Sequence, residues 1–122
     1  MGKYNIRKTN TGIKFDLKAA NGEVIATSEV YKSKAACLNG IKSVRTNASL
    51  AELEDQTNED FEKCKNPKFE MYLDKAGEHR FRLKAKNGQI IATSEGYKAK
   101  KSCLNGIESV RINSASEVIE EE

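Results

Sequence analysis

No tryptophan, one proline and one histidine occur among the 122 residues of this chain. No apolar run approaches the roughly 18 residues that a membrane-spanning helix requires. The segment Met1-Gly2-Lys3-Tyr4 leads directly into patterned sequence, without the apolar core of a signal peptide. We therefore expect a cytoplasmic protein without a membrane partner.

The shortage of histidine and of phosphate-binding motifs limits the chemistry that the chain can perform. His79 is the single histidine, and neither GxxxxGK[ST] nor GxGxxG occurs. A histidine-activated nucleophile and a metal site are therefore not expected. The sequence predicts no catalytic residue, no metal ligand and no cofactor.

Neither the cysteines nor the charged residues indicate a particular site or partner. Cys37, Cys64 and Cys103 are odd in number and lack the close spacing of a metal site or disulfide framework, so we interpret them as reduced thiols. Lysine and arginine number 21 against 18 aspartate and glutamate residues, which gives a net charge of +3. Such a mixed surface does not select a partner by charge.

An internal repeat dominates the sequence. From Ala19 to Asn47, 20 of 29 residues are identical to the residues 66 positions later. A duplication of this kind predicts that the fold is built from two copies of one structural unit. The predicted organisation is repeat one at 3–57, a linker at 58–67 and repeat two at 68–122, together forming one compact pseudo-twofold domain. We expect this domain to be a monomer.

Each repeat has the pattern strand, strand, strand, helix, strand. Apolar residues alternate with polar ones in the strands, as in Phe15, Leu17 and Ala19. Asn21-Gly22 and Asn87-Gly88 predict hairpins with type I′ turns, because Asn and Gly best tolerate positive φ. Such a two-residue loop would pair Ala19 with Val24 and Leu17 with Ala26 on the core side, and would place Ile25 on the opposite face.

The helix of repeat one is predicted to run from Ser33, its N-cap, to about Asn47. Its apolar stripe consists of Cys37, Ile41 and Val44, at i, i+4 and i+7. Cysteines on such a stripe are buried small hydrophobic residues and not nucleophiles. Glycine in the middle of a helix is unfavourable, so Gly40 and its counterpart Gly106 indicate close helix-to-sheet contact.

The hairpin-to-helix pattern resembles a known family. The segment Lys84-Ala85-Lys86-Asn87-Gly88-Gln89-Ile90-Ile91-Ala92-Thr93-Ser94-Glu95-Gly96-Tyr97, followed by Asn105-Gly106-Ile107-Glu108-Ser109-Val110, is similar to the bacterial YegP-like proteins of unknown function. The resemblance implies an α+β fold: a tandem duplication of a β-β-β-α-β unit that forms one continuous antiparallel sheet. Two helices would cover one face, and the repeats would exchange their C-terminal strands, so that Leu53 pairs with repeat two and Val118 with repeat one.

Two surfaces are candidate ligand sites. The first is the open face of the sheet, which is basic and could follow a phosphate backbone, with Tyr72 as a stacking surface, although Asp16, Glu70 and Asp74 share that face. The second is the corner where the third strand of each repeat leads into the helix. The candidate residues are Lys18, Arg80, Arg82 and Lys84 on the open face, and Glu29, Tyr31, Glu95 and Tyr97 at the corners.

Three functions follow from these surfaces. We favour a small non-enzymatic binding or interaction module, whose partner could be a protein. The first alternative is nucleic-acid binding through the basic open face, and the second is an enzyme or small-ligand site at the corners. A simpler interpretation of the corners is that Ser and Glu satisfy turn amides and Tyr fastens the helix to the sheet. Asn39 and Asn105 are expected to bond neighbouring backbone.

Overall fold

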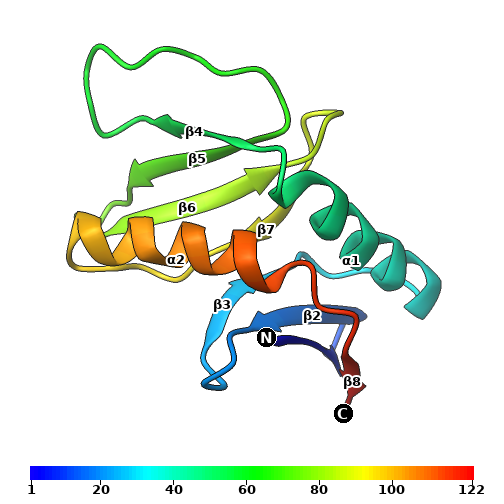
Figure 1. The fold of residues 1–122 in the computed structure, drawn as a ribbon. Coiled ribbons are helices and arrows are strands. Elements are labelled where there is room, and N and C mark those ends of the chain that lie inside the picture. Colours follow the sequence, from blue (N-terminus) through cyan, green and yellow to red (C-terminus); the bar gives the residue numbers. More distant parts are fainter.

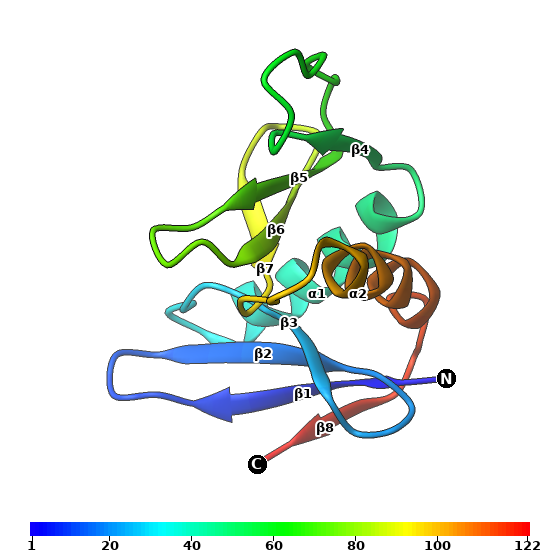
Figure 2. The same cartoon turned by 90° about the vertical axis from the view of Figure 1, so that its left-hand side faces the viewer.

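The computed structural model describes residues 1–122 and contains two β-β-β-α-β repeats. The strands are β1 (Lys3–Lys8), β2 (Ile13–Lys18), β3 (Val24–Thr27), β4 (Glu52–Asp55), β5 (Lys68–Leu73), β6 (His79–Lys84), β7 (Ile90–Thr93) and β8 (Ile119–Glu121), and the helices are α1 (Lys34–Ala48) and α2 (Lys100–Asn113). Both helices lie on the same face of one twisted sheet (Figures 1 and 2). Neither α1 nor α2 has the length and hydrophobicity that a membrane-spanning helix needs.

The repeats exchange their last strands. The sheet order is β4-β5-β6-β7-β3-β2-β1-β8, so β4 of repeat one lies beside β5 of repeat two, and β8 lies beside β1. Leu53 pairs with Phe69, and the Tyr4 N–H donates to Val118 O at 2.9 Å. The exchange predicted from the resemblance is confirmed. The six inner strands are antiparallel, whereas both exchanged strands pair in parallel, which makes the sheet mixed.

The two halves of the sheet meet at one residue pair, Thr27 of β3 and Thr93 of β7. Further connection comes from the helices, which cross the boundary between the repeats. Helix α1 contacts β6 and β7 of repeat two, and α2 contacts β2 and β3 of repeat one. Because each helix covers strands of both repeats, the chain has one core and not two.

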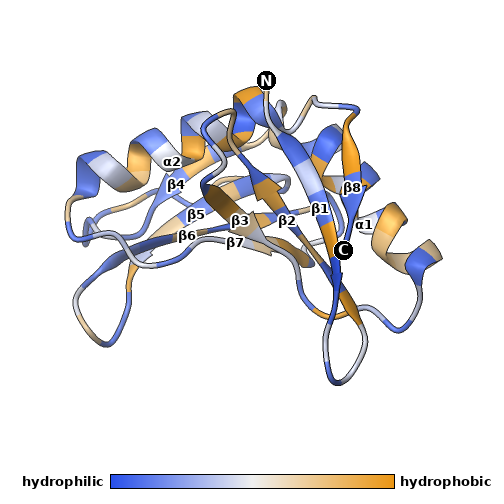
Figure 3. Cartoon of the chain, turned by 90° about the horizontal axis from the view of Figure 1, so that it is seen from below, coloured by the Kyte–Doolittle hydropathy of each residue, from blue (hydrophilic) through white to orange (hydrophobic).

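The helix prediction is confirmed at its cap and its buried stripe. Ser33 Oγ accepts from the Ala36 N–H at 3.1 Å, whereas Ala99 makes no such bond in α2. The residues of the apolar stripe, Cys37, Ile41 and Val44, are completely buried. Figure 3 shows the strands that receive them, along which hydrophobic and hydrophilic residues alternate.

The predicted type I′ turn is wrong. The Gly22 N–H donates to Ala19 O at 2.9 Å, and Gly22 is the only residue of this turn with positive φ, at 87°. Asn21 keeps a negative φ while its side chain accepts from the Glu23 N–H, the pattern of a longer loop with glycine in the left-handed position. The loop therefore contains one residue more than predicted, and a β-bulge between Leu17 and Lys18 takes up this residue, so the predicted pairing of Leu17 with Ala26 is confirmed. Val24 pairs with Lys18 and is exposed, whereas Ile25 is buried, the reverse of the prediction.

Candidate functional site

One residue of each strand lies on a line that crosses the open face of the sheet from edge to edge. Neighbours on this line are partners in the strand registers. The line, here called the polar row, consists in order of Glu120, Asn5, Asp16, Thr27, Thr93, Arg82, Glu70 and Glu54. Thr27 and Thr93, at the centre of the polar row, are equivalent residues of the two repeats and pair with each other. Polar atoms of both repeats therefore meet on this face.

Three carboxylates of the polar row, those of Asp16, Glu70 and Glu54, lie beneath the basic side chains that neutralise them. The Asp16 side chain is 8% exposed, and that of Arg7, whose Nε lies 2.8 Å from Asp16 Oδ2, is 38% exposed. Glu70 is 5% exposed and lies 2.6 Å from Arg82 Nε. Burial raises the pKa of Glu70, but hydrogen bonds from Arg82 and Lys68 outweigh it and lower the pKa below its usual value. Most guanidinium groups on this face are therefore already paired.

The four predicted basic residues occupy the open face with different partners. Arg80 Nε lies 2.6 Å from Asp74 Oδ2, and Lys84 Nζ lies 3.3 Å from Glu70. The Arg82 guanidinium also lies 4.6 Å from the ring centroid of Tyr72, which covers the expected stacking surface. Lys18 has no carboxylate within ion-pair distance.

The β4 edge of the polar row is enclosed by the linker. Glu54 is 2% exposed and accepts from Lys68 Nζ, Gln56 Nε2 and the Cys64 N–H, at 2.8, 2.6 and 2.8 Å. Burial raises the pKa of Glu54, but these three hydrogen bonds outweigh it and lower the pKa to about 2. The corresponding residue of β8, Glu120, is exposed and forms one ion pair, with Lys3. The Glu54 cluster is a closed ion-pair network with no room for a ligand.

At both corners the serine hydroxyl group makes hydrogen bonds to the backbone of the protein. Ser28 Oγ accepts from the Phe15 N–H at 2.9 Å and donates to Glu29 O at 2.8 Å, and Ser94 makes the same two bonds with Phe81 and Glu95. The Glu29 and Glu95 side chains are exposed and make no hydrogen bond. The seryl hydroxyls therefore close the strand-to-helix turn in both repeats.

Tyr31 and Tyr97 pack against the helices from the same corners. The Tyr31 ring stacks on Phe15, with centroids 6.3 Å apart and planes 8° apart. The Tyr97 hydroxyl lies where a Cβ on Gly106 would come within 2.7 Å of it. Burial raises the pKa of both tyrosines, and the nearby Glu29 or Glu95 adds to the shift. These two side chains fasten the helices to the sheet.

The cysteines and the histidine form no reactive pair. Cys37 and Cys103 are buried, and burial raises the pKa of Cys37 and raises that of Cys103 to about 11. The backbone of His79 pairs with Leu73 and Tyr97 at the start of β6. The Nδ1 atom of its side chain is buried without a hydrogen-bond partner. No group of three His, Cys, Asp or Glu side chains comes close enough to hold a metal ion.

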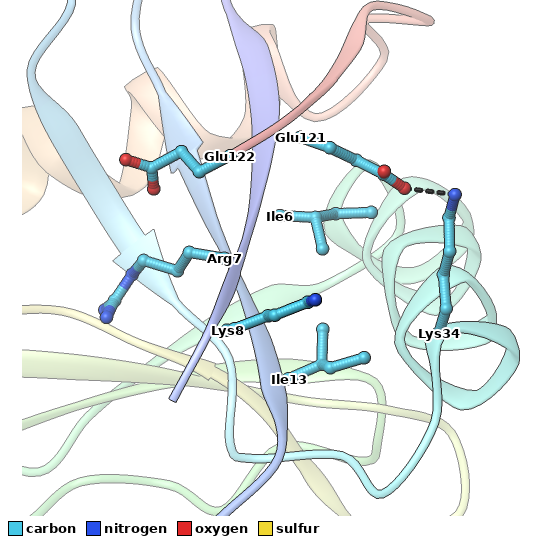
Figure 4. A pocket seen from close by; sticks show the side chains of 7 residues that line it. All are labelled: Ile6, Arg7, Lys8, Ile13, Lys34, Glu121 and Glu122. Atoms are coloured by element: carbon cyan, nitrogen blue, oxygen red, sulfur yellow. Dashed lines mark ion pairs between the residues drawn. The ribbon is translucent and has the colours of Figure 1, made fainter. Parts of the chain in front are cut away.

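Three surface pockets remain. The first, of about 60 Å³, lies between β1, β8 and the start of α1. Figure 4 shows Ile6, Lys8 and Ile13 on the side of β1 that faces Lys34, which is ion-paired with Glu121. The second, of about 270 Å³, lies beside the N-terminus and the β2–β3 turn. The first pocket is small, and two of its cations, Arg7 and Lys34, are already ion-paired.

The third pocket, of about 200 Å³, is formed by both repeats and is here called the seam cleft. Its lining residues come from the β2–β3 hairpin, the corner of repeat two and α2, and are Ala19, Asn21, Glu23, Ile25, Tyr97, Ser102, Asn105, Gly106 and Ser109. Of the residues predicted as sites, only Tyr97 lies here.

Sequence reasoning missed Asn105, because its side chain was expected to bond the backbone. In the structure Asn39 and Asn105 are both exposed, and neither side chain makes an intramolecular hydrogen bond. A signal was present: Ser102, Asn105 and Ser109 recur at helical spacing beside Gly106, which indicates one polar stripe. That the stripe faces a hairpin of the other repeat depends on the fold.

Comparisons with known proteins agree with the duplication. A family described as a domain of unknown function (DUF1508) matches the chain twice, at residues 9–55 and 74–121. The UPF0339 protein YegP of Yersinia pestis is 43% identical over 122 residues, which are 99% of this chain and 96% of that protein. A UPF0339 protein of Methanosarcina acetivorans is 61% identical over 46 residues, 38% of this chain and 79% of the relative, which is thus little longer than one repeat.

A solved structure supports the fold over almost the whole chain. The solution NMR structure of yegP from E. coli, a protein of unknown function, superposes with a TM-score of 0.78 at 34% sequence identity. The match covers 99% of this chain and 92% of the other. None of these descriptions names a ligand, a reaction or a partner.

Proposed function

The chain belongs to the DUF1508 family, whose function is unknown, with two copies of its domain, and we propose that it is a small non-enzymatic binding module. The repeats supply a rigid scaffold in which each helix covers strands of the other repeat. Such a scaffold presents polar side chains in fixed positions and so lowers the entropic cost of binding.

The observation that carries this proposal is that the duplicated serine and cysteine side chains are either hydrogen-bonded within the protein or buried. Ser28 and Ser94 are fully occupied by backbone groups, and Cys37 and Cys103 are buried among apolar residues. A nucleophile requires an adjacent base and access to substrate, and none of these four residues has both. Several polar side chains that lack intramolecular partners, among them Ser102 and Asn105, line the seam cleft, where they are available to a ligand without a chemical step.

An amide-NMR titration of the intact protein tests the proposal. Single-stranded DNA, RNA and a mixture of small metabolites are added separately at low salt, and each sample is then analysed for new products by mass spectrometry. The expected result is a set of localised, saturable shifts without product. Conversion of any added compound by the protein would contradict the proposal.

Nucleic-acid binding by the open face is the second candidate, and one observation favours it. Arg7, Arg80 and Arg82 are 30% to 38% exposed, whereas their carboxylate partners are 5% to 17% exposed. A phosphate backbone would therefore meet the cations first. Binding of this type weakens steeply with added salt, so shifts at Lys18, Arg82 and Lys84 that persist in high salt, or no shifts with DNA or RNA, would exclude it.

A further inference from the structure

The seam cleft exists because of how the repeats interlock. The β2–β3 hairpin of repeat one contributes Asn21 and Glu23, and the corner and α2 of repeat two contribute Tyr97 and Asn105. Helix α2 contacts β3 directly, which holds the two walls in place. A site built on packed elements of this kind is preformed, as ligand sites usually are.

The lining offers hydrogen-bonding groups that the protein does not use. Ser102 and Asn105 are exposed and make no side-chain hydrogen bond, and the Tyr97 hydroxyl lies over Gly106 with no partner. The Ser109 hydroxyl accepts from Asn113 Nδ2 at 3.1 Å and keeps its own proton available. Hydroxyl and amide groups can each donate and accept, so they suit a ligand that carries several hydroxyl groups.

The charge of the lining is negative. Glu23 is exposed and has no ion-pair partner, and the lining contains no lysine, arginine or histidine. The other two pockets each include at least one lysine. Burial raises the pKa of Tyr97, and Glu95 and Glu23 both add to this shift. An anionic ligand is therefore disfavoured, and a cationic group beside Glu23 would be stabilised.

We propose that the seam cleft binds a small polyhydroxylated molecule with one ammonium group, such as an amino sugar or amino alcohol. The ammonium group pairs with Glu23, and the hydroxyl groups bond to Ser102, Asn105 and Tyr97. The cleft volume of about 200 Å³ lies below the roughly 300–1,000 Å³ typical of pockets for drug-sized ligands, so a smaller molecule is expected. This proposal rests on the proposed function and names its site.

Each chain contains one such site. At the equivalent place on α1, Ala36 stands where α2 has Ser102, and Gln89 replaces Glu23. Gln89 also accepts from Asn87 Nδ2 within its own hairpin, at 3.3 Å. No pocket opens there. The two repeats therefore differ at the positions where the proposed ligand binds. Residues of one repeat can thus serve as controls for the equivalent residues of the other.

The test uses three probes of equal size and different charge, glucosamine, glucose and glucuronate, in amide-NMR titrations of the intact protein. Glucosamine should shift residues 19–25 and 97–109 and bind about tenfold or more tightly than glucose, because a charge-assisted bond is the stronger one. Glucuronate should bind most weakly. Glu23→Gln, which installs the residue of repeat two, should remove the preference for glucosamine. Asn105→Ala should weaken binding several-fold.

Two controls separate the site from a general charge effect. Glu29→Gln removes the same charge at the corner of repeat one, and Asn39→Ala truncates the equivalent asparagine of α1; both should leave binding unchanged. Equal affinity for glucosamine and glucose, shifts elsewhere in the chain, or no binding of any probe would overturn this inference. The binding-module proposal would fail separately, through product formation in the metabolite screen.

Discussion

The Tyr31 hydroxyl lies directly over Gly40, at the point where α1 crosses the sheet. A Cβ on Gly40 would overlap the hydroxyl oxygen and would lie 3.1 Å from Phe15 Cε2. The ring cannot easily move aside, because it stacks on Phe15 and because the Tyr31 backbone is hydrogen-bonded to Ile13. Glycine is therefore required here by contact, in spite of its cost in a helix.

Gly40→Ala should lower the free energy of unfolding by about 1 kcal/mol or more, although alanine favours the helix by about 1 kcal/mol, because overpacking commonly costs more than that. In a Tyr31→Phe background, which removes the overlapping oxygen, the same substitution should cost less. Urea unfolding of the four proteins measures the coupling. Equal effects in both backgrounds would show that the hydroxyl contact is not the reason for the glycine.

Glu54 and Glu120 occupy equivalent positions on the two exchanged strands, but only Glu54 is buried, beside Lys68. Glu54→Ala should therefore lower the free energy of unfolding by about 3 kcal/mol, since it removes one partner of a buried ion pair. Glu120→Ala should cost less than about 1 kcal/mol because its ion pair is exposed. Similar losses in the two variants would contradict the closed network at β4.

The lowered pKa of Glu54 also predicts how stability depends on pH. The pKa of Glu54 falls from 4.5 to about 2 on folding. Between pH 2 and pH 4.5 the unfolded state therefore binds more protons than the folded state, and the free energy of unfolding rises with pH. The contribution, roughly 3 kcal/mol, should be complete above pH 4.5 and be lost as the pH falls to about 2. Asp55 and Glu70, whose pKa values are also lowered, act in the same direction.

Unfolding in urea at a series of pH values measures this dependence. Glu54→Gln should flatten the curve between pH 4.5 and 2 and leave a smaller slope from the remaining carboxylates. An unchanged slope in that variant would show that Glu54 titrates normally in the folded protein.

The three cysteines should react at very different rates with a thiol-specific dye. Burial raises the pKa of all three thiols, so accessibility decides the rate: Cys64 is partly exposed, with its Sγ 3.6 Å from Leu53 O, whereas Cys37 and Cys103 are buried. One thiol should therefore label in the folded protein and three after denaturation. Cys64→Ser should remove the native reaction. Rapid labelling of Cys37 or Cys103 would contradict their role as core residues.

Local periodicity was sufficient to predict the elements of the fold. The stripe of Cys37, Ile41 and Val44 and the Ser33 cap depend on residues within one helix, and both are confirmed. The exchanged strands were expected only from the family resemblance, because nothing in the residues near Leu53 specifies pairing with Phe69. The pairing of Leu17 with Ala26 was predicted correctly, whereas Val24 and Ile25 were placed wrongly, because Asn21-Gly22 is compatible with two loop lengths and the longer loop is followed by a β-bulge that the sequence does not specify.

The candidate site was predictable only in part. The acidic and basic residues of the open face follow from alternation, but the burial of Glu54 depends on the linker, whose Cys64 N–H donates to the Glu54 carboxylate. The seam cleft combines Glu23 with Asn105, more than eighty residues apart in the chain, and their approach results from α2 covering the strands of the other repeat. Such juxtapositions are properties of the assembled fold and not of any sequence segment.

The most direct test of the central claim is the recovery of a bound compound. A compound that shifts the amide resonances of the intact protein is incubated at saturation, the protein is denatured, and the compound is quantified by mass spectrometry against a protein-free sample. We expect the compound to be recovered unchanged and in full, because a binding module performs no chemical step. Protein-dependent loss of the compound with appearance of a product would contradict the account and identify the protein as an enzyme.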